Sequence, residues 1–131
     1  LQSVSECILQ PQSDLDKVRQ FLHQHGFQIV QEKKLIDEGK YYVVMRVLHG
    51  EERIYTEAED IYGRFLINEK HPVLKEYLEK QKAVKEKLLL ALKDKTSEKS
   101  HERQQELLHE LQIINETITR MVDENAEQRP D

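Results

Sequence analysis

The sequence predicts an α/β fold in which a short strand, a helix and a β-hairpin are followed by an antiparallel pair of long helices. Three patterns indicate this fold. Near the start, apolar residues recur at helical spacing. The next segment is rich in Val, Ile and Tyr and is interrupted by a short loop that contains glycine. The second half carries two apolar stripes with steps of three and four residues.

Composition limits the size of the core and the class of protein. Of the 131 residues, 37% are hydrophobic and 34% charged, and none is Trp, which favours a small globular part with a helical appendage. The net charge of -5 argues against a uniformly basic nucleic-acid binder but can hide a local basic face. No apolar run reaches the roughly 20 residues of a membrane helix, and no signal-peptide pattern opens the chain. We therefore expect a soluble, cytoplasmic protein with no membrane partner.

The first strand ends at Leu9 and is followed by Gln10-Pro11-Gln12. Ser13 is a suitable N-cap for a helix over residues 14–25, and Gly26 is placed for a left-handed C-terminal cap. The core face of this helix is expected to consist of its regularly spaced apolar residues, which are Leu15, Val18, Phe21 and Leu22.

Residues 27–36 and 41–48 are predicted to form a β-hairpin around the loop Asp37-Glu38-Gly39-Lys40. Because the first strand reaches the second through a helix, these two strands are expected to be parallel neighbours. A parallel sheet is normally covered by helices on both faces, yet only one such helix precedes the hairpin. Part of the sheet is therefore expected to lie on the N-terminal side of this sequence.

Thr56 and Glu59 form a capping-box pattern that predicts a short helix over residues 57–62, ending at Gly63. Residues 64–67 are expected to be a brief connector with an apolar patch. Pro72 suits the first turn of the next helix.

Two long helices are predicted from the stripes in the second half of the chain. The first stripe consists of Leu74, Tyr77, Gln81, Val84, Leu88 and Ala91, and the second of Leu107, Leu111, Ile114, Ile118 and Met121. Residues 94–100 are polar and have no apolar anchor, so the stripes are expected to pair as an antiparallel coiled coil. The expected divisions are 1–50 for the α/β part, 51–71 for a connector with a short helix, 72–124 for the helical hairpin and 125–131 for a tail.

Several kinds of site are absent from the sequence. The four glycines are too far apart to form a phosphate-binding loop or a dinucleotide fingerprint, so no cofactor-binding residues are assigned to this chain. His23 and His25 are two residues apart on the predicted helix and so point to different sides, which fits a solvated helix end better than a metal site. No metal site and no catalytic residue are assigned.

Basic residues are concentrated at the start of the second half. Lys75, Lys82 and Lys85 share roughly one helical side, Lys80 and Lys87 lie on a neighbouring side, and Arg64 and Lys70 precede them. Such a series could neutralise phosphates along an RNA backbone. The pattern alone favours the other interpretation, a solvated face in which the lysines form local ion pairs with Glu76, Glu79 and Glu86. Aromatic residues for base stacking are sparse in this helix.

Several short motifs, taken in this order, resemble the C-terminal half of the bacterial tRNA (adenine-N1)-methyltransferases that modify adenine 22. The motifs are Ile8-Leu9-Gln10-Pro11-Gln12, Phe21-Leu22 with His25-Gly26-Phe27, Glu38-Gly39-Lys40-Tyr41-Tyr42, and Glu59 with Tyr62-Gly63-Arg64-Phe65-Leu66 and Glu69-Lys70. The similarity covers nearly the whole chain and ends in the same two-helix coiled coil.

The resemblance implies the end of a Rossmann-like sheet in a class I enzyme that uses S-adenosylmethionine. The donor site would then lie in a missing N-terminal methyltransferase half, and this fragment alone would be inactive. Gln10 and Pro11, with Gln12, would border the substrate pocket, and the coiled coil would contact tRNA through the basic residues described above. The family usually has Asn at the position of Gln12, whose longer amide reaches a different point, and Pro at the position of Arg64.

Two functions remain open at this point. The first is the C-terminal portion of a tRNA (adenine-N1)-methyltransferase, with tRNA as its partner. The alternative is a non-enzymatic coiled-coil module that binds another protein and has no role with RNA.

Overall fold

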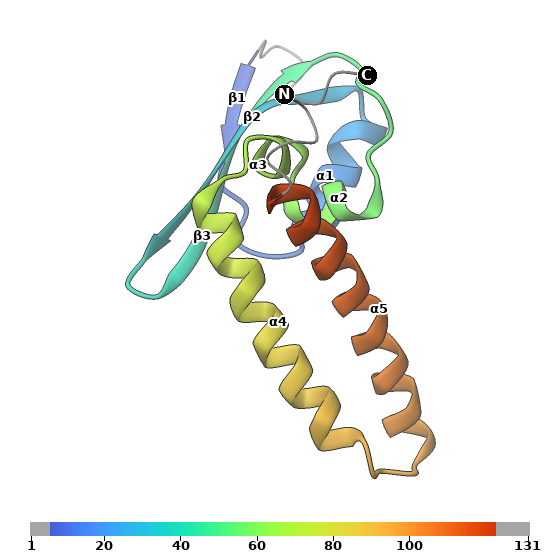
Figure 1. Ribbon diagram of the computed structural model, residues 1–131. Helices are drawn as coiled ribbons and strands as arrows, with labels where there is room; N and C mark the ends of the chain where they lie inside the picture. The colour runs from blue at the N-terminus through green and yellow to red at the C-terminus, as the bar shows by residue number, and fades with distance from the viewer. Residues whose placement is uncertain (1–5, 123–131) are drawn as a thin grey trace, which may run out of the picture. The chain divides into compact units, whose positions relative to one another are not determined.

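The computed structural model describes residues 6–122, and the chain divides after Leu74 into two compact units. The first unit contains a small sheet with helices packed on it, and the second contains a pair of long helices (Figure 1). The class is therefore α/β, as predicted. None of the helices in the described part of the chain is long and apolar enough to cross a membrane.

The sheet of the first unit has three strands, β1 (Glu6–Leu9), β2 (Phe27–Asp37) and β3 (Lys40–His49), in the order β1-β3-β2. Both strand pairs are antiparallel. The expectation that β1 and β2 are parallel neighbours is therefore wrong. They do run in the same direction, but β3 lies between them, because a crossover helix constrains strand direction and not adjacency.

The β2–β3 hairpin is confirmed, with a tighter turn than expected. The strands extend to Asp37 and from Lys40, so only Glu38 and Gly39 form the turn. Both have positive φ, 50° and 78°, which is the type I′ geometry that matches the twist of the flanking strands.

Helix α1 (Leu15–Gln24) packs on one face of the sheet through Leu22, which is 4% exposed. The helix begins after Asp14, which has φ of 51° and no side-chain cap bond, so the assignment of Ser13 as N-cap is wrong. Phe21 is also not a core residue, since it is 52% exposed. The left-handed conformation of Gly26 is confirmed by its φ of 79°.

Two short helices follow the sheet. Helix α2 (Glu57–Tyr62) has the expected capping box: the Thr56 hydroxyl accepts from Glu59 N–H, and the Glu59 carboxylate accepts from Thr56 N–H. The expected connector at residues 64–67 is instead helix α3 (Arg64–Asn68). Leu66 and Ile67 in this helix are both buried, so the expected apolar patch is part of the packed structure.

The core lies between the sheet and these helices. Its buried apolar residues are Leu22, Ile29, Val43, Met45, Val47 and Tyr55. No helix among the described residues of this unit, 6–74, packs on the opposite face of the sheet (Figure 1). Ile8 and Leu35 are 67% and 50% exposed, respectively.

The second unit is an antiparallel pair of long helices, as predicted. Helix α4 (Pro72–Leu92), which begins at the end of the first unit, starts at the expected proline, and α5 (Glu98–Val122) returns beside it. Gln104 Nε2 donates to Leu92 O at 2.7 Å, and Lys85 Nζ lies 3.1 Å from Glu110 Oε1. The expected stripe on α5 is confirmed by the buried residues Leu107, Leu111, Ile114 and Met121, with Ile118 half-buried.

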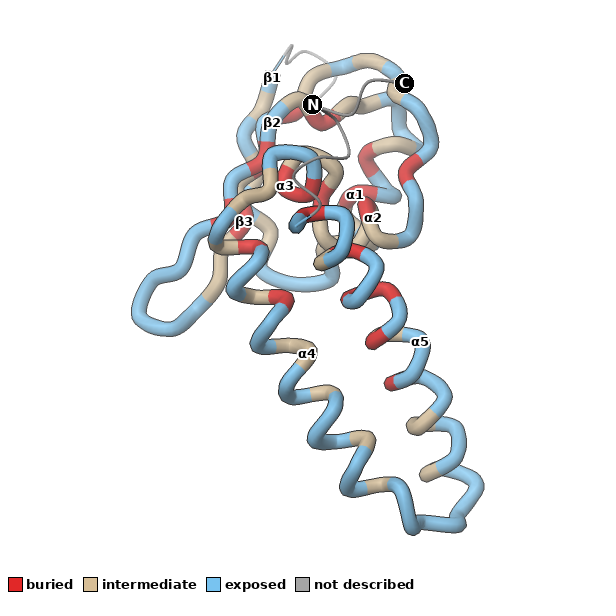
Figure 2. The backbone as a smooth tube through the Cα atoms, in the orientation of Figure 1, coloured by how far each residue is buried: buried red, intermediate tan, exposed pale blue. Residues whose placement is uncertain are grey.

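The stripe expected on α4 is wrong beyond its first turns. Val84 and Leu88 are 52% and 45% exposed, whereas Lys85 and Leu89, each one position further along, are half-buried. Buried positions in α4 occur only near its start, at Leu74 and Leu78 (Figure 2). The expected tail at residues 125–131 and the last two residues of the predicted hairpin, 123–124, lie outside the described residues.

Candidate functional site

The predicted pocket-bordering residues directly follow β1. Gln10 and Gln12 are exposed and Pro11 is half-buried. Leu9 is the last residue of β1 and pairs with Met45, while β3 begins at Lys40, five residues earlier. The β2–β3 hairpin therefore projects beyond the end of the sheet at which Gln10 and Pro11 lie.

The five predicted lysines of α4 have different surroundings. Lys75 and Lys87 are exposed, and Lys82 is half-buried. Lys80 Nζ lies 3.3 Å from Glu76 Oε1 in an exposed pair one turn apart. Lys85 faces α5, where it pairs with Glu110 and keeps only 17% of its side chain exposed. Lys85 thus helps to join the two helices.

The two predicted cations of the first unit are less accessible than their sequence context indicates. Lys70 is half-buried. The Arg64 guanidinium lies 5.4 Å from the centre of the Phe65 ring, and its NH1 donates to Glu52 Oε2 at 3.3 Å. Arg64 therefore belongs to a polar network inside the first unit.

The most buried part of that network is an ion pair that periodicity did not reveal. Arg19 and Glu32 have fully buried side chains, with Arg19 NH2 2.7 Å from Glu32 Oε1 and Arg19 Nε 3.1 Å from Oε2. Arg19 NH1 also donates to the carbonyl oxygens of Asp60 and Ile61, at 2.6 and 2.9 Å. One guanidinium thus connects α1, β2 and the last turn of α2, where helix carbonyls lack partners.

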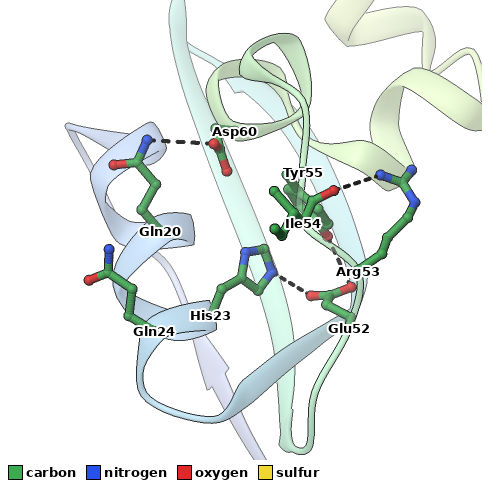
Figure 3. A pocket seen from close by; sticks show the side chains of 8 residues that line it. All are labelled: Gln20, His23, Gln24, Glu52, Arg53, Ile54, Tyr55 and Asp60. Carbon is green, nitrogen blue, oxygen red and sulfur yellow. Dashed lines mark hydrogen bonds and ion pairs between the residues drawn. The ribbon is translucent and has the colours of Figure 1, made fainter.

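Glu52 is the centre of a second group of contacts. Its Oε1 accepts from Ile29 N–H at 2.9 Å and lies 2.6 Å from His23 Nε2. Its Oε2 accepts from the Tyr55 hydroxyl at 3.4 Å and from Arg64. The interpretation of His23 as part of a solvated helix end is wrong, because its side chain is only 18% exposed and points at Glu52 (Figure 3).

A pocket of about 350 Å³ lies beside this group, between α1 and the segment that follows β3 (Figure 3). Its lining residues are Gln20, His23, Gln24, Glu52, Arg53, Ile54, Tyr55 and Asp60. Burial raises the pKa of the Asp60 carboxyl and, more strongly, that of the Tyr55 hydroxyl. Helical spacing places Gln20, His23 and Gln24 on one side of α1, but no sequence signal pointed to Glu52 or Asp60.

Lys34 is a further buried ionisable group of this unit. Its side chain lies on the core side of β2 with its Nζ 5.6 Å from the centre of the Tyr41 ring. Burial, followed by the nearby Arg19 charge, lowers the pKa of Lys34 to about 8. Within residues 6–122, no group of three or more His, Cys, Asp and Glu side chains is placed to hold a metal ion.

Comparison with known structures shows the same fold in bacterial methyltransferase relatives. Sp1610 from Streptococcus pneumoniae, crystallised with S-adenosyl-L-methionine, matches 88% of this chain at 31% identity and a TM-score of 0.73. TrmK from B. subtilis, described as an M1A22 tRNA methyltransferase, matches 86% at 22% identity and a TM-score of 0.76. TrmK from M. capricolum, solved with S-adenosyl-homocysteine, matches 92% at 18% identity and a TM-score of 0.75. The last two likenesses show the fold alone.

This chain covers only part of the length of each of these proteins. The chain spans 48%, 51% and 52% of the three solved chains, or about half of each. Comparison with curated proteins gave no match. The model of one family, tRNA (adenine(22)-N(1))-methyltransferase, matches residues 1–116. This match covers most of the sequence, so the chain belongs to the tRNA (adenine(22)-N(1))-methyltransferase family.

Proposed function

We propose that this chain is the C-terminal portion of an S-adenosylmethionine-dependent tRNA (adenine-N1)-methyltransferase. In that role it completes the catalytic sheet and presents a helical hairpin to tRNA in the cytoplasm. The observation that carries the proposal is the family match over residues 1–116. It is supported by the coverage of the S-adenosyl-L-methionine complex, whose chain is about twice as long as the part matched here.

The sheet also supports an upstream half. Among residues 6–122, β1 pairs along only one edge, with β3. Ile8 in β1 is 67% exposed, and the face on which it lies is not covered by a helix of its unit. Further strands beside β1 and helices on that face would remove both apolar surface and unpaired backbone groups from water.

The methyl donor is assigned to the upstream half because the residues of this chain do not fit it. A donor site of this class needs a glycine-rich turn between a strand and a helix. Gly26, Gly39, Gly50 and Gly63 stand in four separate turns, and the β1–α1 connection contains none of them. We therefore assign no cofactor contact to this chain, and expect it to be inactive by itself.

Gln10 and Pro11 are proposed to border the adenine pocket, with the exposed Gln12 amide beside them. They lie at the carboxyl end of β1, the edge at which open α/β sheets bind ligands. Gln10→Ala in the complete enzyme should raise KM for tRNA more than it lowers kcat if the amide only positions the base. An unchanged KM would remove Gln10 from this role.

The tRNA-contacting surface is proposed to be the exposed side of α4. This helix carries five Lys and three Glu, a net charge of +2, whereas α5 carries five Glu against three Lys and Arg, a net charge of -2. The exposed members Lys75, Lys80 and Lys87, with the half-buried Lys82, are the direct phosphate ligands in this proposal. Lys85, Lys70 and Arg64 contribute mainly positive potential, because Lys85 and Arg64 are held in part-buried contacts with carboxylates, whereas the Lys80–Glu76 pair is exposed and can open to a phosphate.

The test compares two triple variants that lose the same charge. K75A/K82A/K87A removes cations from α4, and K17A/K33A/K40A removes three exposed cations from the first unit. The α4 variant should bind tRNA more weakly and reduce the salt-dependence slope of binding by roughly two to three. The control variant should change both much less. Equal effects of the two variants, or no effect of either, would contradict this interface.

One observation favours the alternative of a protein-interaction module. Leu90 and Leu108 are 70% and 48% exposed, and Leu90 lines a groove between α4 and α5. Exposed leucines beside an interhelical groove are typical of helix-binding surfaces. If K75A/K82A/K87A left tRNA binding unchanged while L90S abolished binding to a cellular protein, this alternative would replace the tRNA role.

A further inference from the structure

The pocket between α1 and the segment after β3 lies away from the proposed substrate edge. β3 is antiparallel to β1, with Glu6 opposite Leu48, so β3 ends where β1 begins. Glu52 follows that end and binds the backbone of Ile29 near the start of β2. Gln10 lies at the other end of β1. The pocket is therefore separate from the edge at which adenine is proposed to bind.

One wall of the pocket is a histidine with a fixed orientation. His23 Nε2 is 2.6 Å from Glu52, and its ring meets the Tyr55 ring edge-on at 4.3 Å between centroids. Glu52 is satisfied by its further contacts with Ile29, Tyr55 and Arg64. When Nε2 carries the hydrogen directed at Glu52 and the ring is neutral, Nδ1 is left as an acceptor. Figure 3 shows Nδ1 on the side of the ring that faces Asp60.

The opposite wall contains a carboxylate whose only side-chain hydrogen bond with a described residue is a long one. Asp60 Oδ1 is buried and accepts no hydrogen bond from a described residue. Its other oxygen, Oδ2, has one long contact of 3.5 Å with Gln20 Nε2. Asp60 forms no ion pair with a described residue, whereas the neighbouring Arg53 is already paired with Glu59. Because Oδ1 is closed off from the pocket, the oxygen that a ligand can reach is Oδ2, whose single long contact leaves it able to accept a closer donor.

The rest of the pocket is lined by the two Gln amides, by Arg53, whose charge is paired with Glu59, by Tyr55 and by Ile54. Ile54 is 92% exposed and supplies an apolar wall, which an isolated water or ammonium ion would not need. A volume of about 350 Å³ is larger than a single ammonium group requires and accommodates a short alkyl chain as well. The pocket thus combines acceptors, an unpaired negative charge and an apolar wall.

We propose that this pocket binds a small organic cation, whose ammonium or guanidinium group donates to Asp60 and His23 Nδ1 and whose apolar body lies on Ile54. The cation gives Asp60 Oδ2 a closer donor than Gln20 does and neutralises the carboxylate charge, while the Gln20 and Gln24 amides adapt to the rest of the head group. This site is independent of tRNA binding and of the methyl donor.

The test uses butylammonium, butylguanidinium and the neutral analogue butanol, added to the whole chain and followed by NMR at Ile54 and His23. One or both cations should give saturable changes in NMR chemical shift at these residues. Comparing the affinities of the two cations then shows which head group is preferred. Butanol should give none. D60N should weaken cation binding roughly tenfold, because a charge-assisted hydrogen bond is lost. D37N, which removes an equal charge at the end of the hairpin, should leave binding unchanged.

A second variant tests the proposal even if D60N does not fold. Ile54 is almost fully exposed, so I54S should fold normally and weaken binding of the butyl cations several-fold. The absence of saturable shifts with either cation would overturn the proposal. So would equal loss of binding in D60N and D37N, since that result indicates general charge attraction.

Discussion

Replacing Arg19 with Met should destabilise the first unit more than any single change at its surface. Arg19 makes two contacts with Glu32 and two with carbonyl oxygens of α2, and both charged side chains are fully buried. Met keeps much of the volume but leaves the Glu32 carboxylate buried without its cation. Breaking a buried pair in this way costs about 3–5 kcal/mol. That is a large part of the roughly 5–15 kcal/mol that stabilises a small domain.

The double variant R19M/E32M separates the charge from the packing. With both charges removed, only the Asp60 and Ile61 carbonyl groups lose a donor, at a cost of about 1–3 kcal/mol. We therefore expect R19M/E32M to be more stable than R19M, with a coupling energy of at least about 1 kcal/mol. R46M is the matched surface control, because the Arg46–Glu6 pair is exposed and should leave the unfolding midpoint nearly unchanged.

The assay is urea unfolding followed by tyrosine near-ultraviolet circular dichroism, which mainly reports the first unit, since four of the five tyrosines lie there. At a typical slope of about 1–3 kcal/mol per molar urea, R19M should lower the midpoint by roughly 1–5 M. The reasoning is refuted if R19M loses less than about 1 kcal/mol. It is also refuted if R19M/E32M loses as much as the sum of the two single variants.

Three further changes should each have a defined effect. Gly63→Ala should lower the free energy of unfolding, measured by thermal unfolding, by about 2–3 kcal/mol, because φ is 98° and a Cβ would lie 3.0 Å from both Arg19 NH2 and Glu32 Oε1. Gly39→Ala, which has open space around the added Cβ, should lower it by about 1 kcal/mol. An equal loss in both would contradict the steric part of this account. Thr56→Ala should lower the free energy of unfolding by about 1 kcal/mol and speed up amide hydrogen exchange in α2, because Glu59 N–H loses its acceptor. Unchanged exchange rates would show that the cap is dispensable. Lys34 has a pKa of about 8 when folded against 10.5 in the unfolded chain, so the unfolded state binds more protons between these values. Wild-type stability should therefore rise from about pH 8 to pH 10 relative to K34M, and a flat difference would mean that Lys34 is not desolvated.

Local signals in the sequence were reliable where the determining contacts are local. The capping box at Thr56 and Glu59 forms within one helical turn, and the two-residue turn at Glu38 and Gly39 depends on positive φ values that these residue types tolerate. Helix α2 has the predicted bounds, and the hairpin lies within one residue of its predicted strands.

The order of the strands was beyond the reach of local patterns, because β1 is 36 or more residues away from the partner it finds in β3. The prediction of which side of α4 packs against α5 failed for a related reason. Apolar residues occupy two adjacent sides of α4, and only the position of α5 decides that Leu89, and not Leu88, is half-buried.

The candidate sites were only partly accessible from sequence. Arg19, Glu32 and Lys34 are charged residues at buried positions, so a hydrophobic pattern places them on the solvent side. Glu52 reaches the pocket beside His23 from a segment with irregular structure, and Asp60 does so from α2, a helix of six residues that is too short for periodicity to show which side faces α1. In contrast, the family motifs around Gln10 and Gly63 are contiguous in sequence, and membership of the family is confirmed.

The most direct test of the central claim is transfer of a labelled methyl group from S-adenosyl-L-methionine to tRNA. It should be measured for this chain alone and for this chain fused behind the part of Streptococcus pneumoniae Sp1610 that it does not match. We expect transfer to adenine N1 by the fusion and none by the chain alone, although the chain alone should retain tRNA on a filter at low salt. Methyl transfer by the isolated chain would contradict the assignment of the donor site to an upstream half.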